Sequence, residues 1–427
     1  MRDMKDSGFV WLGKIPKSWA TKKVKQIFFQ KKEKAFTDNP TILSLARDGV
    51  KIRDISTNEG QLAADYSTYN PVSKNDLLLN PMDLYSGDNC NISRIEGVIS
   101  PAYVNLRNIS QSDTPDFFNY YFKHQYWSMA FFAHGRGVSF ENRWTLTNEV
   151  LRNYPVLYPS ALEQQAIADY LDGECARIDG IVATQRQIIE RLKEYKKSVI
   201  TEAVTRGLNP DAPMKDSGIE WIGVVPVHWG ICKIKHKNKL KTGTTPSTSI
   251  PDIFEGDVFW ITPSDFNENI IIHDSSRHLN TIALTENMIA LFPAFTTYII
   301  GIGATTGKIA FSEKQASCNQ QITAIIQEPF VSKYLMYYML SQAQTIKDLA
   351  QYTTLPILNN EKLGSYVYLD VPSDEQQAIA NYLDQKCAEI DSIIEKRENM
   401  IDLLTEYKKS LIYECVTGKK EIVDVVE

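Results

Sequence analysis

MKDSGFVWLGKIPKSWATKKVK, residues 4–25, is repeated as MKDSGIEWIGVVPVHWGICKIK at residues 214–235. Both stretches open on Met-Lys-Asp-Ser-Gly and then place a Trp, a Pro and a second Trp at matching positions. Self-similarity at one fixed spacing is the signature of a duplicated architecture. The chain is therefore predicted to contain two copies of one structural plan.

A second repeated segment reads EQQAIADYLDGECARIDGIV from residue 163 and EQQAIANYLDQKCAEIDSII from residue 375. Its apolar residues recur with the seven-residue spacing of a coiled-coil helix, which leaves one apolar seam along each copy. Two similar halves of a chain usually pack about a twofold axis, so the two helices are predicted to pair antiparallel. The predicted seam residues are Leu171, Ile178, Ile189, Leu192, Val199, Leu383, Ile390, Ile401, Leu404 and Leu411.

These repeats predict a domain organisation in which two globular blocks alternate with two helices. The connector between the halves contains Gly, Asn-Pro and Ala-Pro, which end a helix and start a loop. Short β-like stretches such as 97–106 and 296–312, with helical segments near 116–132 and 331–349, predict α+β blocks. The predicted boundaries are block one at 1–158, the first helix at 159–207, a linker at 208–213, block two at 214–371, the second helix at 372–418 and a tail at 419–427.

Composition predicts a soluble globular protein. Of its 427 residues, 43% are hydrophobic and 23% are charged, and the formal net charge is −6. No apolar run is long enough to span a bilayer, and the polar N-terminus lacks the apolar core of a signal peptide. We therefore expect a cytoplasmic location and no membrane partner. The six cysteines are scattered without CxxC spacing, so neither a metal site nor a disulfide framework is indicated.

Basic segments suggest nucleic-acid contacts. In KIKHKNKLK, residues 233–241, lysine stands at every second position, so an extended strand would place these ammonium groups on one face. Phosphate contact is one interpretation, and a plain solvated strand face is the other. In block one, Arg136 and Arg143 flank polar residues in GRGVSFENRW, and an arginine fork can bind guanine bidentately. Lys51 and Arg53 are further candidates there, with surface salt bridges as the alternative role.

No catalytic motif is present in the sequence. The loop GIGATTGKIAF, residues 301–311, departs from the phosphate-binding G-x-x-x-x-G-K-[ST] pattern because Ile302 and Ile309 stand where a Gly and a hydroxyl residue are required. A hairpin whose tip carries Thr305, Thr306 and Lys308 is predicted instead. No metalloprotease H-E-x-x-H or nucleophile G-x-S-x-G motif occurs either. The residues therefore offer no catalytic constellation.

Taken together, several motifs resemble the specificity subunit of type I restriction-modification systems. They are IPKSW and VPVHW at the block starts, NRWTLTNEVLRNYPVLYPSALEQQAIADYLD at the first junction, TGTTPS, FWITPSDF and GATTGKIA in block two, and VPSDEQQAIANYLD at the second junction. The resemblance covers nearly the full chain. It implies two α+β target recognition domains joined by a long antiparallel two-helix coiled coil, with a pseudo-twofold internal repeat.

The resemblance also implies a function and partners for a subunit that is not itself an enzyme. Each target recognition domain would read one half of a bipartite, asymmetric double-stranded DNA site, and the helices would set the unread spacer. Two methyltransferase subunits, which bind S-adenosylmethionine and methylate adenine, would join the chain, and the full complex would add two ATP-driven restriction subunits. S-adenosylmethionine, ATP and magnesium are expected on those partners, and no cofactor or metal is expected on this chain. The sequence leaves open whether restriction subunits join and which bases are read.

The candidate binding residues follow from the motifs and the repeat. DNA-binding candidates are Lys51, Arg53, Arg136, Arg143, Lys241, Thr244, Thr245, Ser264, Thr305, Thr306 and Lys308. Residues that both helices share outside the seam are candidates for partner binding, with plain helix solvation as the alternative; they are Glu194, Tyr195, Lys197, Glu406, Tyr407 and Lys409. Two other functions compete with DNA recognition. One is a coiled-coil scaffold joining two protein-binding domains, and the other is a nucleotide-using enzyme built around residues 301–308.

Overall fold

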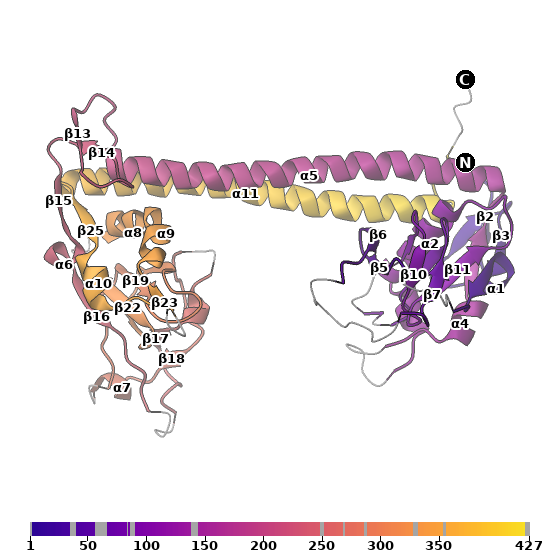
Figure 1. Ribbon diagram of the computed structural model, residues 1–427, viewed down its shortest axis with the longest axis horizontal. Coiled ribbons are helices and arrows are strands. Elements are labelled where there is room, and N and C mark those ends of the chain that lie inside the picture. The colour runs from indigo at the N-terminus through magenta and orange to yellow at the C-terminus, as the bar shows by residue number, and fades with distance from the viewer. Residues whose placement is uncertain are drawn as a thin grey trace. The chain divides into compact units, whose positions relative to one another are not determined.

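A computed structural model describes residues 2–34, 40–55, 66–82, 84–85, 90–137, 144–247, 252–267, 270–285, 288–327, 332–352 and 356–422. The chain forms two compact units. Unit 1 comprises Met1–Gln185 and Glu398–Glu427, and unit 2 comprises Arg186–Arg397. Strands and helices are mixed in each unit, which confirms the predicted α+β class (Figure 1).

Unit 1 is built on a four-stranded antiparallel sheet, ordered β4-β11-β8-β9. Helix α2 packs against it (Figure 1). Its aromatic rings Phe117, Phe118, Tyr121 and Phe122 are fully buried in the core. Its proline at the first helical position has no N–H to leave unsatisfied, which favours a helix start there. The strands are β1 (Met4–Asp6), β2 (Lys14–Pro16), β3 (Ala20–Lys23), β4 (Phe28–Lys31), β5 (Leu43–Ala46), β6 (Gly49–Ile52), β7 (Asn70–Val72), β8 (Leu77–Leu79), β9 (Cys90–Ile92), β10 (Gly97–Ile99), β11 (Val104–Asn108) and β12 (Pro155–Tyr158). The short helices are α1 (Val24–Ile27), α2 (Pro115–Trp127), α3 (Ala130–Ala133) and α4 (Asn148–Asn153).

Unit 2 contains a matching antiparallel sheet, ordered β16-β22-β19-β20, with α8 packed against β19 and β20. A second sheet, β18-β17-β21, pairs β17 and β21 in parallel. The strands are β13 (Met214–Asp216), β14 (Val224–Pro226), β15 (Gly230–Lys233), β16 (Lys239–Thr242), β17 (Val258–Ile261), β18 (His278–Leu279), β19 (Thr296–Ile300), β20 (Ile309–Ser312), β21 (Ala316–Cys318), β22 (Ile322–Ile326), β23 (Gln351–Tyr352), β24 (Pro356–Ile357) and β25 (Val367–Asp370). The short helices are α6 (Ile234–Lys237), η1 (Pro263–Asp265), α7 (Ile282–Thr285), α8 (Ser332–Ser341), α9 (Ala343–Asp348) and α10 (Asn360–Ser365).

Two long helices supply residues to both units: α5, Ala161–Arg206, and α11, Ser373–Val416. In unit 1 the start of α5 packs on the end of α11, and Lys408 of α11 forms an ion pair with Asp179 of α5 at 2.7 Å. In unit 2 the end of α5 packs on the start of α11, and Lys196 forms an ion pair with Asp391 at 2.7 Å. Within each unit the two helices therefore run antiparallel.

The predicted seam residues are buried to different degrees. Seven are buried: Leu171, Ile178, Ile189, Val199, Leu383, Ile390 and Leu411. Leu192, Ile401 and Leu404 are half-buried. Apolar residues spaced seven apart lie along one side of a helix, so that side faces the partner helix and its residues are buried.

The repeated tryptophans fasten the long helices to the globular blocks. In unit 1, Trp19 is fully buried and its indole N–H donates a hydrogen bond to the Glu163 carboxylate of α5 at 3.2 Å. In unit 2, Trp229 is equally buried and donates to the Glu375 carboxylate of α11 at 3.0 Å. A buried indole N–H requires an acceptor, and in each unit the Trp of the opening repeat finds it in the Glu of the helix repeat.

A glycine follows each long helix and packs on the buried tryptophan of its own unit, which is Trp229 for Gly207 and Trp19 for Gly418. Gly207 after α5 and Gly418 after α11 have φ angles of +75° and +70°, which favour glycine because a Cβ would strain the backbone. A Cβ on Gly207 would lie 3.2 Å from the Trp229 ring, and a Cβ on Gly418 would overlap Pro16. Each helix therefore ends against the opening motif of a block.

One local prediction is wrong. The segment 233–241 was expected to be an extended strand with its lysines on one face, but α6 interrupts it between β15 and β16. The helical turn closes where the Asn238 N–H donates to the Ile234 carbonyl at 2.9 Å, and Ile234 is buried. Burial of this apolar side chain outweighs the alternating pattern, so the lysines do not share one strand face.

Candidate nucleic-acid interface

The first candidate loop of unit 2 follows β16 and carries Thr244 and Thr245. The Thr244 N–H donates to the Cys318 carbonyl at 2.9 Å, and the Thr245 hydroxyl donates to the side-chain oxygen of Gln320. At Gly243 a Cβ would overlap the Cys318 carbonyl, so the close approach of these two loops requires glycine there. Thr244, Thr245 and Gln320 are all exposed.

Ser264 lies in a tight turn beside this loop. The Asn319 N–H donates to the Ile261 carbonyl at 3.0 Å, which holds the two segments together. The hydroxyls of Thr262 and Ser264 are 2.7 Å apart, and the Asp265 carboxylate accepts hydrogen bonds from the Thr262 N–H at 2.7 Å and its hydroxyl at 2.9 Å. Asp265 is buried and fixes the turn, whereas Ser264 is exposed.

The predicted hairpin is confirmed: β19 and β20 pair antiparallel, with residues 301–308 between them. The Gly301 N–H donates to the Gln321 carbonyl at 2.7 Å, which places the hairpin base beside the preceding loops. Lys308 is exposed and Thr305 is half-exposed. Thr306 is buried, and its hydroxyl donates to a backbone carbonyl of its own loop at 2.7 Å, so its geometry favours a structural role.

Unit 2 thus joins four polar loops that are far apart in sequence. We call residues 243–245, 262–265, 301–308 and 319–321 the loop cluster. A cavity of about 370 Å³ beside it is lined by Thr305 and Lys308, together with Asn267 and Lys347, which the motifs did not indicate. The sequence motifs did not indicate Gln320 of the loop cluster either. No local signal identifies these three residues, because only the tertiary structure brings them to the cluster.

Lys241 stands at the end of β16, two residues before the loop cluster. It is exposed and pairs with Ala324 of β22 in the sheet register. Its neighbour in the lysine-rich segment, Lys237, forms an ion pair with Asp370 at 2.9 Å. That hydrogen bond raises the pKa of Lys237 and engages its charge within unit 2.

The candidates of unit 1 lie on separate elements. Lys51 is on β6, where its ammonium group bonds Asp48 at 2.6 Å and thereby lowers the pKa of that carboxyl. The Arg53 N–H donates to the backbone beside β5 at 2.8 Å. Arg136 follows α3, is exposed, and bonds Thr145 through its backbone at 2.9 Å. Arg143 lies outside the described residues.

The candidate partner-binding residues lie on the exposed faces of α5 and α11. The side chains of Tyr195 and Tyr407 are 56% and 49% exposed, although both are large and aromatic. Glu194, Lys197 and Glu406 are exposed, and Lys409 forms an ion pair with Glu406 at 2.8 Å. Exposed aromatic residues on a helix are typical of protein-binding surfaces.

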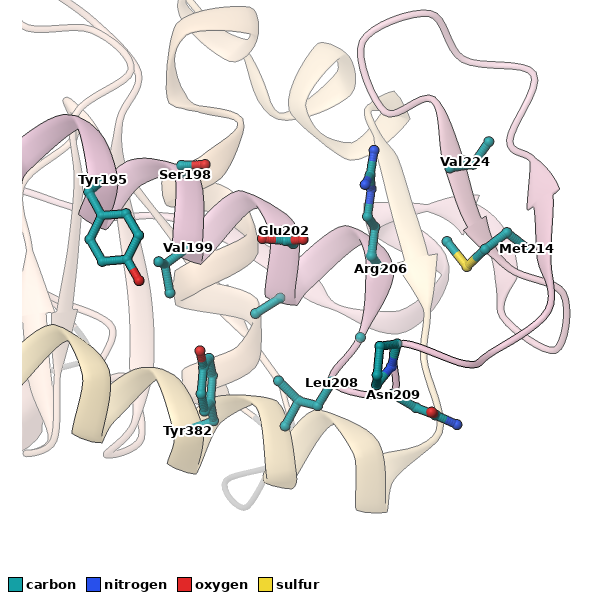
Figure 2. A pocket seen from close by; sticks show the side chains of 13 residues that line it. Tyr195, Ser198, Val199, Glu202, Arg206, Leu208, Asn209, Met214, Val224 and Tyr382 are labelled. Carbon is teal, nitrogen blue, oxygen red and sulfur yellow. The ribbon is translucent and has the colours of Figure 1, made fainter.

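Tyr195 also lines a groove of about 620 Å³ in unit 2. Figure 2 shows that Tyr195 from α5 and Tyr382 from α11 point toward one another across it, with Leu208 on the same side as Tyr382. Val199 and Ala203 provide an apolar floor, and Glu202 adds a carboxylate. The groove combines apolar, hydroxyl and charged groups, which suits a protein segment better than a nucleic-acid strand.

The described residues contain neither a metal-ligating cluster nor a helix that could span a membrane. No group of three His, Cys, Asp or Glu side chains there could hold a metal ion. None of the helices in the described part of the chain is both long and apolar enough to cross a bilayer. The cysteines there are free thiols, and burial raises the pKa of Cys90 to about 12 and that of Cys415 to about 12, which keeps both thiols protonated and unreactive.

The part of the chain that contains the loop cluster resembles a known domain. Residues 226–403 match the type I restriction modification DNA specificity domain. Over this stretch the chain is similar to the specificity subunits of type I restriction enzymes. It is 32% identical over 189 residues to the type I restriction enzyme MjaIX specificity subunit of Methanocaldococcus jannaschii, covering 43% of this chain and 42% of the relative. The HindI specificity subunit of Haemophilus influenzae is 27% identical over 201 residues, again with 42% of its length covered and 46% of this chain. The alignments to these two curated relatives span about two-fifths of the relatives' length.

Solved structures support the same fold. A structure reported for complex assembly and conformational transition of the type I restriction-modification system matches with a TM-score of 0.72, covering 95% of this chain and 99% of the other at 13% identity. The HsdS subunit from Thermoanaerobacter tengcongensis matches with a TM-score of 0.53 over 95% of this chain and 98% of the other, also at 13% identity.

Proposed function

We propose that the chain is the DNA sequence-specificity subunit of a type I restriction-modification complex and recognises a bipartite, asymmetric DNA site. The observation that carries this proposal is the match of residues 226–403 to a DNA specificity domain, because that range contains the loop cluster. Exposed hydroxyl and amide side chains beside lysines are the groups that bind base edges and phosphates. Thr244, Thr245, Ser264, Thr305 and Lys308 are the proposed contacts, and Lys241 adds charge beside them.

The two blocks would read different half-sites. Residues 1–158 and 214–371 are the proposed target recognition domains. Unit 1 offers Arg136, Lys51 and Arg53 as candidate contacts, on elements unlike those of the loop cluster. Different side chains on different loops present different hydrogen-bond patterns, so an asymmetric site is the expected outcome.

The long helices would act as the spacer between the two readers. The antiparallel helix contacts in each unit, with their matching Lys–Asp ion pairs, support one continuous two-helix coiled coil formed by 159–207 and 372–418. A packed helix pair is stiff, unlike a flexible linker, and keeps a fixed length of DNA unread. The same repeat supports a pseudo-twofold arrangement of the two halves.

The chain would recruit its catalytic partners rather than act on DNA itself. We propose that two methyltransferase subunits bind the repeated helix faces that carry Tyr195 and Tyr407, because two copies of one surface suit two copies of one partner. Restriction subunits would complete the complex. The chemistry of methyl transfer and ATP use, with S-adenosylmethionine, ATP and magnesium, would reside on those partners, and this chain would be non-catalytic.

Methylome sequencing tests the proposal directly. Cells expressing the chain with its methyltransferase partner should carry adenine methylation at one bipartite sequence. Exchange of residues 1–158 for the block of another specificity subunit should change one half-site only. Insertion of seven residues in each long helix should leave both half-sites unchanged and lengthen the spacer by about 10 Å, or about three base pairs.

The same experiment separates DNA recognition from a protein scaffold. A scaffold without DNA contact would leave the methylated sequence unchanged when either block is exchanged. Methylation at a single contiguous sequence would contradict the assignment of one block to each half-site.

A further inference from the structure

Unit 1 contains a basic groove that none of its sequence motifs indicated. Two adjoining hollows of about 540 and 500 Å³ share Gln30, Lys32 and Asn148 in their walls. β4, the segment that follows it and the first turn of α4 supply much of the lining. We call this feature the lysine groove, after its cations Lys25, Lys31, Lys32, Lys34 and Arg152.

The charge of the lysine groove is of one sign. Among the described residues no Asp or Glu lines either hollow, and the nearby acids Glu33 and Glu149 lie on the same segments but outside both linings. Lys25, Lys32 and Arg152 are exposed, as is Lys34. Cations gathered along a hollow without acids focus a positive potential, which attracts an anionic chain.

Most of these cations have no partner in the part of the chain that the structure describes. Among the described residues, Lys25, Lys32, Lys34 and Arg152 make no side-chain hydrogen bond or ion pair, and Lys31 reaches only the Ser73 hydroxyl at 3.4 Å. Lys51 on β6 differs, because Asp48 neutralises its charge at 2.6 Å. The lysine groove therefore presents charge that is available to a ligand.

Apolar and polar side chains complete the lysine groove. Phe29 and Ile109 line it and are 57% and 60% exposed, which is high for large apolar side chains. Tyr103 lines the neighbouring hollow beside Thr68 and Asn70. Aromatic and aliphatic surface next to cations suits a chain that alternates phosphates with sugars.

We infer that the lysine groove binds the phosphodiester backbone of duplex DNA and orients block one on its half-site. This inference rests on the proposed function and deepens it, because it assigns phosphate contacts to residues that no motif indicated. Phosphate contacts fix the register of a protein on DNA, while base contacts in other loops select the sequence. The lysine groove would therefore determine affinity and salt dependence more than specificity.

The corresponding elements of unit 2 support the inference independently. There α6 and β16, which correspond to α1 and β4, carry Lys235, Lys239 and Lys241, all exposed. Lys237 in the same segment is excluded because it pairs with Asp370. Lys25 and Lys235 are the last residues of the two copies of the opening repeat, and beyond them the sequences differ, yet exposed lysines continue in both units. A shared need for phosphate contact explains this better than chance solvation of two divergent surfaces.

Salt-dependent binding of the full chain, in complex with its methyltransferase partner, tests the inference. The variant Lys25→Gln/Lys32→Gln/Arg152→Gln should bind mixed-sequence duplex DNA with a log K against log salt slope less steep by about three, because each lost phosphate contact removes about one released counterion. The ratio of target to mixed-sequence affinity should stay unchanged. A duplex with a neutral methylphosphonate backbone should bind the variant and the wild type equally.

A matched control removes the same charge elsewhere in unit 1. Lys5→Gln/Lys14→Gln/Lys17→Gln alters exposed lysines on β1, on β2 and directly after β2, and should keep the wild-type slope. If the groove variant also keeps that slope while the wild type binds DNA, the inference fails and the proposed function stands. If the wild type binds no duplex at all, the proposed function itself fails. Equal competition by polyglutamate at matched charge would overturn the choice of DNA in favour of an acidic protein segment.

Discussion

The tyrosines that fasten α2 in unit 1 have counterparts on α8 in unit 2. The Tyr121 hydroxyl donates to the Pro155 carbonyl at 2.9 Å, and the Tyr338 hydroxyl donates to the Val367 carbonyl at 2.9 Å. Tyr120 on α2 and Tyr337 on α8 likewise donate to an aspartate of a long helix, at 2.6 and 2.8 Å. The two units therefore differ in sequence but retain one set of bonds between block and helix.

The two units differ in the charges on their surfaces. An ion pair of Glu174 with Arg177 in unit 1, at 2.7 Å, is replaced at the same helix positions of unit 2 by Lys386 with Glu389, at 2.8 Å, with the signs reversed. In the segment after α11, the Lys420 ammonium group donates a hydrogen bond to the Tyr170 hydroxyl at 2.6 Å. The segment after α5 instead lines the groove of Figure 2. The comparison shows that the scaffold bonds are retained while the surfaces available to partners differ.

The largest effect is expected where the units agree most closely. Trp19→Ala should destabilise unit 1 by roughly 3–5 kcal/mol, because it removes a fully buried indole and leaves a cavity. Trp229→Ala should destabilise unit 2 by a similar amount, since its burial and its bond to glutamate are the same. Hydrogen-exchange mass spectrometry, read separately over α2 and α8, measures each effect.

Trp19→Phe and Trp229→Phe serve as controls because they keep most of the ring and lose only the donor. Each should cost less than the alanine substitution in the same unit. A rise in exchange over α8 in the Trp19→Ala variant, equal to the rise over α2, would show that the two units do not respond separately.

This agreement between the units could be anticipated from the sequence. The Trp and Glu positions lie in the two longest repeats, and the seven-residue apolar spacing of Leu171 or Leu383 depends on local pattern alone. The loop cluster could not be derived in this way. Gln320 joins it, and Lys347 lines the cavity beside it, only through contacts with distant segments. The lysines of 233–241 were misplaced because burial of Ile234 forms a helical turn.

Acid sensitivity should distinguish the two units. His124 on α2 is 8% exposed and its ring lies 4.9 Å from that of Tyr413 in a tilted arrangement, and its burial together with the nearby Lys419 lowers the pKa of its imidazole to about 4. The folded state therefore favours the neutral ring. Below the usual pKa of 6.5 the unfolded chain takes up the proton first, so stability falls as the pH drops from 6.5 to about 4. The loss should approach about 3 kcal/mol in unit 1.

The chain supplies its own control for this prediction. Counted from the matching tyrosines Tyr121 and Tyr338, the position of His124 on α2 corresponds to Ser341 on α8. His124→Ser should therefore flatten the pH dependence of unit 1 toward that of unit 2, measured by hydrogen exchange between pH 4 and 6.5 with correction for the intrinsic exchange rate. An unchanged pH profile in this variant would assign the acid response to other groups.

The glycines after the two long helices should show a moderate and unequal effect. Alanine at either position is strained by the positive φ, at a cost of about 1 kcal/mol. Gly418→Ala should cost about 2 kcal/mol in all, because its Cβ would overlap Pro16. Gly207→Ala should stay near 1 kcal/mol, since its Cβ would meet only the edge of Trp229 at 3.2 Å. Thermal unfolding of the two variants compares them, and equal shifts would contradict the contact geometry.

The smallest effect is expected at the matching ion pairs between the long helices. Lys408–Asp179 in unit 1 and Lys196–Asp391 in unit 2 have the same length, 2.7 Å, and similar exposure of their carboxylates. Double-mutant cycles with Lys→Gln and Asp→Asn should give a coupling of about 0.5 kcal/mol in each unit, because water screens partly exposed charges. High salt should reduce both couplings together. A coupling confined to one unit would mean that the repeated ion pair does not support the helix contact equally in the two units.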